Sequence, residues 1–236
     1  MPPLATFHAI FHRDVLLNRY APLGLARNPF GSLTPDETAA VAVVDTADIL
    51  NMLGTPGRAV QIIAPRGRGK TTHLRAIERE HPDAAYVYFP QRFRGLNRHP
   101  AVPAADLLIL DEAQRIPRCI ERKIFATETP LLLGTHWSVA KRLRRFGYEV
   151  QTRRLCDHED SSVTERLVDN RLRLAALGDA EPAIIWTTGD AQRLHQRFAG
   201  RHRAMIHYLY QRVERLATEP PRGGTGAGPR KIVFRL

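Results

Sequence analysis

A glycine-rich loop between an apolar segment and an amphipathic segment constrains the fold of this chain more than any other feature. The segment AVQIIA (59–64) predicts a buried strand, PRGRG (65–69) a loop, and residues 70–80 a helix. Backbone N–H groups of such a loop, at the N-terminus of a helix, form a binding site for anions. The sequence therefore predicts an anion site between the first strand of an α/β fold and the helix that follows it.

From Gly69 onward the loop follows the pattern G-x-x-x-x-G-K-[ST] of a nucleotide-binding P-loop, with Ala64 in place of the first glycine. Lys70 is expected to bridge the β- and γ-phosphates, and Thr71 is expected to bind Mg²⁺. A chance basic turn is the alternative. The expected phosphate-binding residues are Pro65, Arg66, Gly67, Arg68, Gly69, Lys70, Thr71 and Thr72.

A second motif places two carboxylates directly after an apolar run, LLIL (107–110). In α/β sheets, ligands bind at the carboxyl ends of the strands. Asp111 is therefore expected to hold Mg²⁺ as a Walker B residue, and Glu112 is expected to act as the general base toward water. A strand that ends in solvated acids is the alternative. Together the two motifs favour binding of ATP with Mg²⁺ and its hydrolysis.

The order of the segments predicts the architecture. Strands at 59–64, 84–89, 106–110, 130–133 and 148–155 alternate with helices, which predicts a five-stranded parallel P-loop NTPase sheet flanked by helices. A capping box at Thr34 and helical spacing up to a stop at Gly54 predict one helix before the sheet. A small all-helical lid follows. The predicted domains are 1–34 (irregular N-terminal extension), 35–157 (ATPase domain), 158–217 (lid) and 218–236 (flexible tail).

These motifs resemble the AAA+ type of P-loop ATPase, and in particular the compact bacterial secretion-type and transposition-type ATPases. The likeness rests on PRGRGKTT (65–72), LLILDEAQR (107–115), LLLGTH (131–136), AGRHRAMIHYLY (199–210), NPF (28–30) and SLTPD (32–36). It implies a "sensor 1" residue at Thr135, with His136 as the alternative, and a "sensor 2" arginine at Arg203. It also implies a homo-oligomer in which a neighbouring subunit supplies an arginine finger, for which the candidates are Arg142, Arg144, Arg145, Arg153 and Arg154.

The charge of the chain indicates a polyanionic partner. Lys and Arg number 35 against 24 Asp and Glu, a net charge of +11. The loop 92–98 and the helix 141–145 are expected to bind DNA phosphates without sequence preference, with Phe93 and His99 stacking on bases. Alternatively, these arginines reflect genome composition or face a neighbouring subunit. Trp137 and Trp186 are expected to be packing residues.

Composition excludes several classes of protein. A hydrophobic share of 43% excludes wholesale disorder, and the apolar runs are too short for a membrane span. Two cysteines exclude a disulfide scaffold and fit a cytoplasmic protein. We therefore expect a cytoplasmic Mg²⁺-dependent ATPase that is coupled to a DNA or DNA–protein assembly. The alternative is a nucleotide-dependent protein-assembly switch with little turnover and no DNA binding. An enzyme that phosphorylates a small molecule is disfavoured by the helical C-terminus.

Overall fold

The computed structural model describes residues 18–91, 99–155, 161–179, 181–199, 201–218 and 232–233. The chain divides into two compact units. One unit is Thr34–His158, and the other combines the chain up to Leu33 with the chain from Glu159 onward. Expectations for the loop 92–98 with Phe93, for Gly200 and for the tail 219–231 lie outside the described residues.

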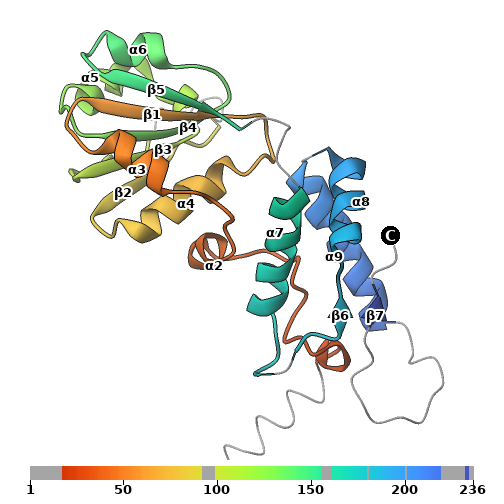
Figure 1. Ribbon diagram of the computed structural model, residues 1–236. Helices are drawn as coiled ribbons and strands as arrows, with labels where there is room; N and C mark the ends of the chain where they lie inside the picture. Colours follow the sequence, from red (N-terminus) through yellow and green to blue (C-terminus); the bar gives the residue numbers. More distant parts are fainter. Residues whose placement is uncertain are drawn as a thin grey trace, which may run out of the picture. The chain divides into compact units, whose positions relative to one another are not determined.

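A parallel sheet forms the centre of the first unit (Figure 1). The strand order is β2-β3-β4-β1-β5, and each neighbouring pair is parallel. This arrangement confirms the five-stranded parallel P-loop NTPase sheet predicted from the sequence. The strands are β1 (Arg58–Ile63), β2 (Ala84–Tyr88), β3 (Leu107–Asp111), β4 (Leu131–Thr135) and β5 (Glu149–Arg154).

Helices cover both faces of this sheet. On β3, Leu107 and Ile109 pack on one face, whereas Leu108 and Leu110 pack on the other, because successive side chains of a strand alternate. The face of Leu107 and Ile109 is covered by α3 and α4, and the opposite face by α5 and α6. Burial on both faces explains why the central strands β3 and β4 begin with the continuous apolar runs LLIL (107–110) and LLL (131–133). The edge strand β5, with the sequence EVQTRR, is mostly exposed. The helices are α3 (Ala47–Leu53), α4 (Lys70–Glu80), α5 (Arg118–Phe125) and α6 (Ala140–Arg144).

The prediction of a single helix before the sheet is wrong, because two short helices form instead, α2 (Pro35–Ala40) and α3. The predicted capping box is present, with the Thr34 hydroxyl accepting from the Glu37 N–H at 3.2 Å. The helix ends at Ala40, where a segment rich in valine begins, and β-branched side chains lose rotamer freedom in a helix. The Asp45 carboxylate then accepts a hydrogen bond from the Ala47 N–H at 3.2 Å. This local bond starts the second helix separately.

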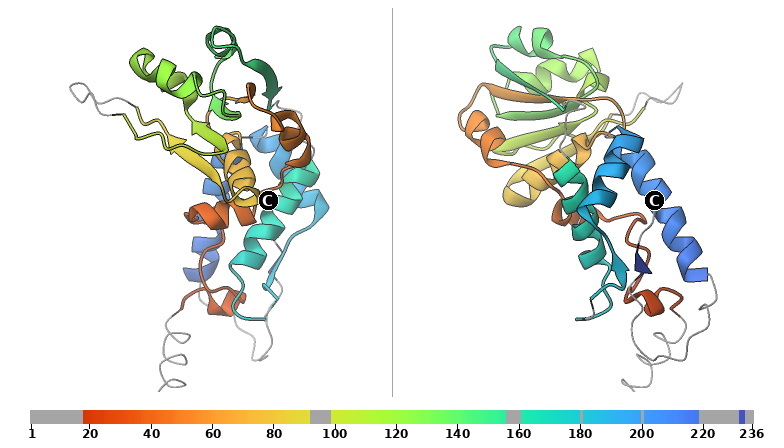
Figure 2. Two further views of the ribbon diagram at one scale, coloured as in Figure 1. Left: turned by 90° about the vertical axis from the view of Figure 1, so that its left-hand side faces the viewer. Right: turned by 45° about the vertical axis from the view of Figure 1, so that its right-hand side comes forward.

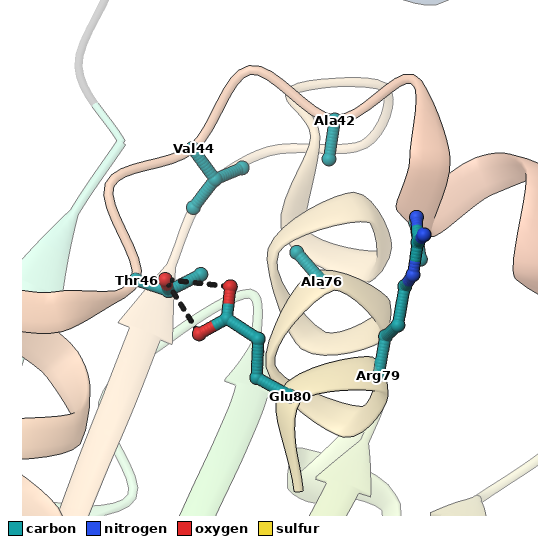
Figure 3. Close-up of a pocket in the computed structure, with 7 residues that line it drawn as sticks. Ala42, Val44, Thr46, Ala76, Arg79 and Glu80 are labelled. Atoms are coloured by element: carbon teal, nitrogen blue, oxygen red, sulfur yellow. Dashed lines mark hydrogen bonds between the residues drawn. The ribbon is translucent and has the colours of Figure 1, made fainter.

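The connector between α2 and α3 leaves a small pocket against α4 (Figure 3). The Thr46 hydroxyl lies 2.9 and 2.8 Å from the two carboxylate oxygens of Glu80, on the side of this pocket. The pocket lies at the C-terminal end of α4, where the helix dipole disfavours anions. It is therefore a poor site for phosphate. Its lining residues are Ala39, Ala42, Val44, Thr46, Ala76, Arg79 and Glu80.

The second unit contains the predicted C-terminal helices, α7 (Ser161–Leu174), α8 (Thr188–Phe198) and α9 (His202–Thr218). A short parallel pair of strands, β6 (Ile184–Ile185) and β7 (Ile232–Val233), adds to them. The apolar stripes expected from helical spacing form its core, which includes Val168, Leu172, Leu194, Met205, Leu209 and Val213. In the described part of the chain, no helix has the length and apolar character needed to cross a membrane.

The segment 18–33 belongs to this helical unit rather than to the sheet. It contains the 3-10 helix η1 (Ala21–Leu23), and Leu23, Leu25 and Phe30 are buried among the helices. The Asn28 amide donates to the Tyr210 carbonyl at 3.1 Å and to the Glu214 carboxylate at 2.8 Å. Asn28 of the sequence NPF (28–30) therefore anchors the segment 18–33 to α9.

Candidate functional site

The P-loop lies between the carboxyl end of β1 and the N-terminus of α4, as predicted. Gly67 and Gly69 have φ angles of 80° and 82°, in the left-handed region that glycine adopts at low cost. Pro65 and Arg66 are exposed, while Arg68 and the two glycines are partly exposed. Thr72 is partly buried in the first turn of α4. The loop thus presents backbone N–H groups at a helix N-terminus, which is a favourable position for phosphate.

Lys70 is buried inside this loop, with 6% of its surface exposed. Its Nζ donates to the carbonyl of Ala64 at 2.7 Å and to the carbonyl of Pro65 at 3.1 Å. The same Nζ lies 3.3 Å from Nδ1 of His136. Since hydrogen bonds between two charged groups are stronger than those to a neutral carbonyl, a phosphate in the loop can displace these partners.

Asp111, at the end of β3, is 2% exposed and accepts three hydrogen bonds. Its Oδ2 accepts from the Thr71 hydroxyl at 2.9 Å and from the Tyr86 hydroxyl at 2.7 Å, and its Oδ1 accepts from the Glu112 N–H at 2.9 Å. The structure therefore brings together the two residues predicted to bind metal, Thr71 and Asp111.

Sequence reasoning missed Tyr86, which lies on β2, the strand next to β3. Burial raises the pKa of the Tyr86 phenol, and the neighbouring Asp111 carboxylate raises it further. The phenol therefore stays protonated and serves as a donor. The Arg75 guanidinium covers the Tyr86 ring at 3.4 Å from its centroid. A tyrosine on the predicted strand beside the acidic motif was the available signal, but it required knowledge of which strands are neighbours.

A hydroxyl and a carboxylate oxygen 2.9 Å apart form a donor set that suits Mg²⁺, which prefers oxygen ligands and usually keeps waters and substrate phosphates. Among the described residues, no group of three or more His, Cys, Asp or Glu side chains could hold a metal ion. A divalent ion at Thr71 and Asp111 would therefore depend on phosphate oxygens to complete its coordination. This dependence is what a metal–nucleotide site requires.

Gly134 on β4 has no side chain, and the Asp111 carboxylate lies in the space that a side chain there would fill. A Cβ atom at this position would lie 2.9 Å from Oδ1 of Asp111 and 2.8 Å from Cδ1 of Leu74. Real Cβ atoms do not approach other atoms this closely, so the side chain or the helix would have to move. The absence of a side chain at Gly134 therefore keeps the carboxylate close to the N-terminal half of α4.

Glu112, the predicted base, has both carboxylate oxygens engaged. Its Oε2 accepts from Nε2 of Gln114 at 2.7 Å and from Nη2 of Arg115 at 2.9 Å, both on η2 (Ala113–Arg115). Its Oε1 lies 3.3 Å from Nε2 of His136. The backbone of Glu112 has a φ of 58°, which is uncommon for a residue with a side chain and is typical of functional sites. Gln114 and Arg115 were not predicted as site residues.

The two candidates for the sensor position lie in different surroundings. Thr135 is fully buried, and its hydroxyl donates to the Trp137 carbonyl at 2.8 Å. The ring of His136 instead lies between Lys70 and Glu112, with one nitrogen near each. Nδ1 of the ring also lies 3.1 Å from the Ala64 carbonyl, which Lys70 contacts as well. The structure therefore brings His136 into the cluster and leaves the Thr135 hydroxyl outside it.

The remaining candidate residues lie elsewhere. Arg203 belongs to the other unit, where it is exposed in the first turn of α9. Two finger candidates are held within the chain, since Arg142 bonds to Glu121 and Arg153 bonds to Asp48. Arg144, Arg145 and Arg154 are exposed, as are Lys141 and His99. The role of each of these residues stays a prediction.

The two tryptophans differ from each other. Trp186 packs against the core of the helical unit, as expected. The prediction that Trp137 is a packing residue is wrong, because 62% of its surface is exposed. It lies just after β4, where the chain leaves the sheet and the interior.

No family model matches the sequence, and no curated protein matches it significantly. Three solved structures illustrate its structural likenesses. Replication initiator DnaA bound to AMPPCP and single-stranded DNA is 13% identical, with a TM-score of 0.45 over 80% of this chain and 67% of that chain. A DNA replication initiation factor is 13% identical, with a TM-score of 0.40 over 78% and 70%. The Thermotoga maritima RuvB Holliday junction branch migration motor is 18% identical, with a TM-score of 0.44 over 80% and 63%. All three TM-scores are below 0.5, so these remote likenesses concern the fold alone. The secretion-type and transposition-type resemblance stays a prediction.

Proposed function

We propose that this chain binds ATP with Mg²⁺ at the P-loop and hydrolyses it, and that hydrolysis is coupled to a DNA or DNA–protein assembly. The observation that carries the proposal is the convergence of Lys70, Thr71, Asp111 and Glu112 at the carboxyl ends of the strands. A chance basic turn and a strand ending in solvated acids do not account for it, because Lys70 and Asp111 are buried.

Each residue of the cluster has a distinct role in this proposal. The N–H groups of residues 67–70 and the Lys70 ammonium bind the phosphates in place of the loop carbonyls. Thr71 and Asp111 hold Mg²⁺, which neutralises phosphate charge when it is bound. Tyr86 donates to Asp111 and keeps its carboxylate oriented toward Thr71.

Glu112 accepts the proton in the hydrolytic step. The water oxygen bonds to the γ-phosphorus, the bond from that phosphorus to the ADP oxygen breaks, and one proton of the water passes to the carboxylate. Since Gln114, Arg115 and His136 contact both carboxylate oxygens, water must take the place of one of them. We assign to His136 the positioning of Glu112, because its ring also reaches the phosphate-binding Lys70.

Residues outside the cluster complete the proposal. Arg203 is assigned as the lid arginine that approaches the γ-phosphate. Arg154 is the remaining finger candidate outside the basic helix α6 in a homo-oligomer, because it is exposed and does not form an ion pair within the described part of the chain. Arg144 and Arg145 are exposed as well and are alternatives to it only if α6 faces a neighbouring subunit and not DNA. The alternative function is a protein-assembly switch with little turnover, which the three contacts that hold Glu112 favour.

Two substitutions test the nucleotide chemistry. Lys70→Ala should abolish ATP binding or hydrolysis, whereas Lys123→Ala, at an exposed lysine of α5, should leave both unchanged. Glu112→Gln should retain ATP without releasing phosphate, whereas Glu128→Gln, at an exposed acid, should turn over normally. Normal turnover by Glu112→Gln would refute the assignment of the base. Phosphate release measured with and without DNA separates the ATPase from the switch, because the switch predicts negligible turnover in both.

The assignment of His136 has its own test. His136→Ala should lower kcat and leave the affinity for ATP within about threefold, since the residue positions Glu112 and not the phosphates. His136→Gln, which retains a donor, should restore part of kcat. Thr135→Val should change kcat less than His136→Ala does. A larger change in kcat for Thr135→Val than for His136→Ala would contradict this assignment and favour Thr135 as the sensor residue.

A further inference from the structure

We propose that the exposed face of α5 and α6 binds the phosphate backbone of a single-stranded nucleic acid, while Trp137 stacks on one of its bases. This inference rests on the proposed function, because it names the form of nucleic acid that the ATPase acts with and the surface that receives it. The predicted loop 92–98 has no part in it. The charge of this face, the packing of its two helices and the exposed indole of Trp137 support the inference.

The charge of this face is of one sign. Helices α5 and α6, together with Arg145 directly after α6, contain seven basic residues and one acidic residue. The acidic residue, Glu121, is paired with Arg142. None of the other six basic residues forms an ion pair within the described part of the chain. All six are exposed, and we call them the α5–α6 cations: Arg118, Arg122, Lys123, Lys141, Arg144 and Arg145.

The two helices hold these cations on a rigid base. Arg142 of α6 donates to the Ile116 carbonyl, just before α5, at 2.9 Å and to the Glu121 carboxylate of α5, which joins the helices side by side (Figure 1). Ile120 and Leu143 are buried against the sheet beneath them. On α5 the cations Arg118 and Arg122 lie one turn apart, so they share one side of the helix.

Arginines on packed helices lose less freedom on binding than arginines on a loop, and their planar fork matches phosphate geometry. Repeated phosphates along a backbone can pair with several cations that two packed helices carry. The face therefore suits a polyanion with regularly spaced phosphates better than a single phosphorylated ligand.

Trp137 indicates that the polyanion has unpaired bases. It directly precedes the segment that leads into α6, and 62% of its surface is exposed. An exposed indole stacks on bases that are not already stacked in a duplex. In the described part of the chain, the only other large hydrophobic side chain that is exposed is Tyr88. This scarcity of exposed apolar groups disfavours an anionic bilayer, whose binding gains from apolar groups that enter it.

The surface is also contiguous with the candidate ATPase site. Trp137 follows His136 in sequence, and the centroids of their rings are 6.4 Å apart. The Trp137 carbonyl accepts the hydrogen bond from the Thr135 hydroxyl at the end of β4. A nucleic acid whose base stacks on Trp137 would therefore lie next to His136, which contacts both Lys70 and Glu112.

The experiment is a titration of the full chain, without nucleotide, against a dye-labelled 20-nucleotide deoxythymidine strand, followed by fluorescence anisotropy at several salt concentrations. If all six α5–α6 cations contact phosphates, log affinity should fall against log salt with a slope of about −4, from about −0.7 per contact on a single strand. Arg118→Ala with Arg122→Ala should make the slope shallower by about 1.4. The matched control is Arg79→Ala with Arg166→Ala, at exposed arginines of α4 and α7, which should leave the slope unchanged.

The aromatic contact has a separate readout. Trp137→Ala should weaken binding of the single strand by about fivefold or more, from at least 1 kcal/mol of stacking per base. It should leave binding of a duplex of equal length unchanged. Circular dichroism of every variant confirms that the fold is retained.

Four outcomes would overturn the inference: no binding at low salt, equal loss in the control pair, tighter binding to phosphatidylserine vesicles than to the strand, or equal effects of Trp137→Ala on strand and duplex. Because nucleotide is absent from the titration, these outcomes do not bear on hydrolysis. Phosphate release by the wild type with no nucleic acid tests the proposed ATPase independently. If the chain hydrolyses ATP but does not bind the single strand, the proposed nucleic-acid surface is refuted and the proposed nucleotide site is not.

Discussion

Tyr86→Phe removes one hydroxyl group from the interior of the sheet unit and leaves the shape of the side chain unchanged. That hydroxyl donates to Oδ2 of Asp111 at 2.7 Å, and Asp111 is 2% exposed. A hydrogen bond to a charged group contributes about 1.5–3 kcal/mol to stability. We therefore expect the free energy of unfolding of this unit to fall by about 2 kcal/mol, which is about a thirtyfold change in its folding equilibrium.

The matched control is Tyr148→Phe. The Tyr148 hydroxyl donates to the Thr129 carbonyl at 2.9 Å, so it bonds a neutral acceptor. This substitution should cost about 1 kcal/mol. The difference between the two variants isolates the charge of Asp111, because each loses the same hydroxyl from a tyrosine of the same sheet unit.

The assay is urea denaturation followed by hydrogen exchange of the β3 amides, which report on the sheet unit by itself. A double-mutant cycle of Tyr86→Phe with Asp111→Asn should show a coupling free energy above about 0.5 kcal/mol. The Tyr86 pKa is raised in the folded state, so its contribution is present below the unfolded value of about 10 and is lost as the pH rises above it. Tyr86→Phe should therefore flatten the alkaline decline of stability. A cost no larger than that of Tyr148→Phe, together with no coupling, would refute the reasoning.

Two further predictions concern the close approach at Gly134 and the hydrogen-bonded carboxylate of Glu214. Gly134→Ala should lower the free energy of unfolding by about 1–3 kcal/mol and weaken binding of Mg²⁺–ATP, because the new Cβ displaces Asp111. Calorimetry measures both the loss of stability and the loss of affinity. The control Gly54→Ala, whose Cβ would meet no atom closer than 3.8 Å, should have little effect on either. Hydrogen bonding by the Tyr20 hydroxyl is the largest cause that lowers the pKa of Glu214, so this stabilisation of the helical unit is present above the ordinary glutamate pKa and is lost as the pH falls through the lowered value. Glu214→Gln should therefore flatten the acid side of its stability curve measured by circular dichroism, and an unchanged acid midpoint would contradict this.

The sequence was sufficient for the parts of the fold whose signals are local. The strands expected at 59–64 and 106–110 are apolar apart from Gln61 and Asp106, and short apolar segments next to turn residues favour buried parallel strands. The P-loop was predictable because its glycines, its lysine and its helix N-terminus are adjacent in the chain. The prediction of one helix from Thr34 to Gly54 was wrong because it considered only the helical spacing of apolar residues. It did not include the rotamer cost of three valines or the hydrogen bond from the Ala47 N–H to the Asp45 carboxylate.

Tertiary structure decided which side chains meet at the site. Whether Thr135 or His136 reaches Glu112 depends on which side of the chain each presents at the end of β4, because consecutive side chains there point in different directions. The contact of Tyr86 with Asp111 depends on strand order, since β2 lies beside β3 across 25 residues of sequence. The sequence alone determined that a lysine and a threonine would begin the helix after the glycine-rich loop, and that two acids would stand at the end of another strand. Only the packing of distant strands determined that a tyrosine and a histidine join them.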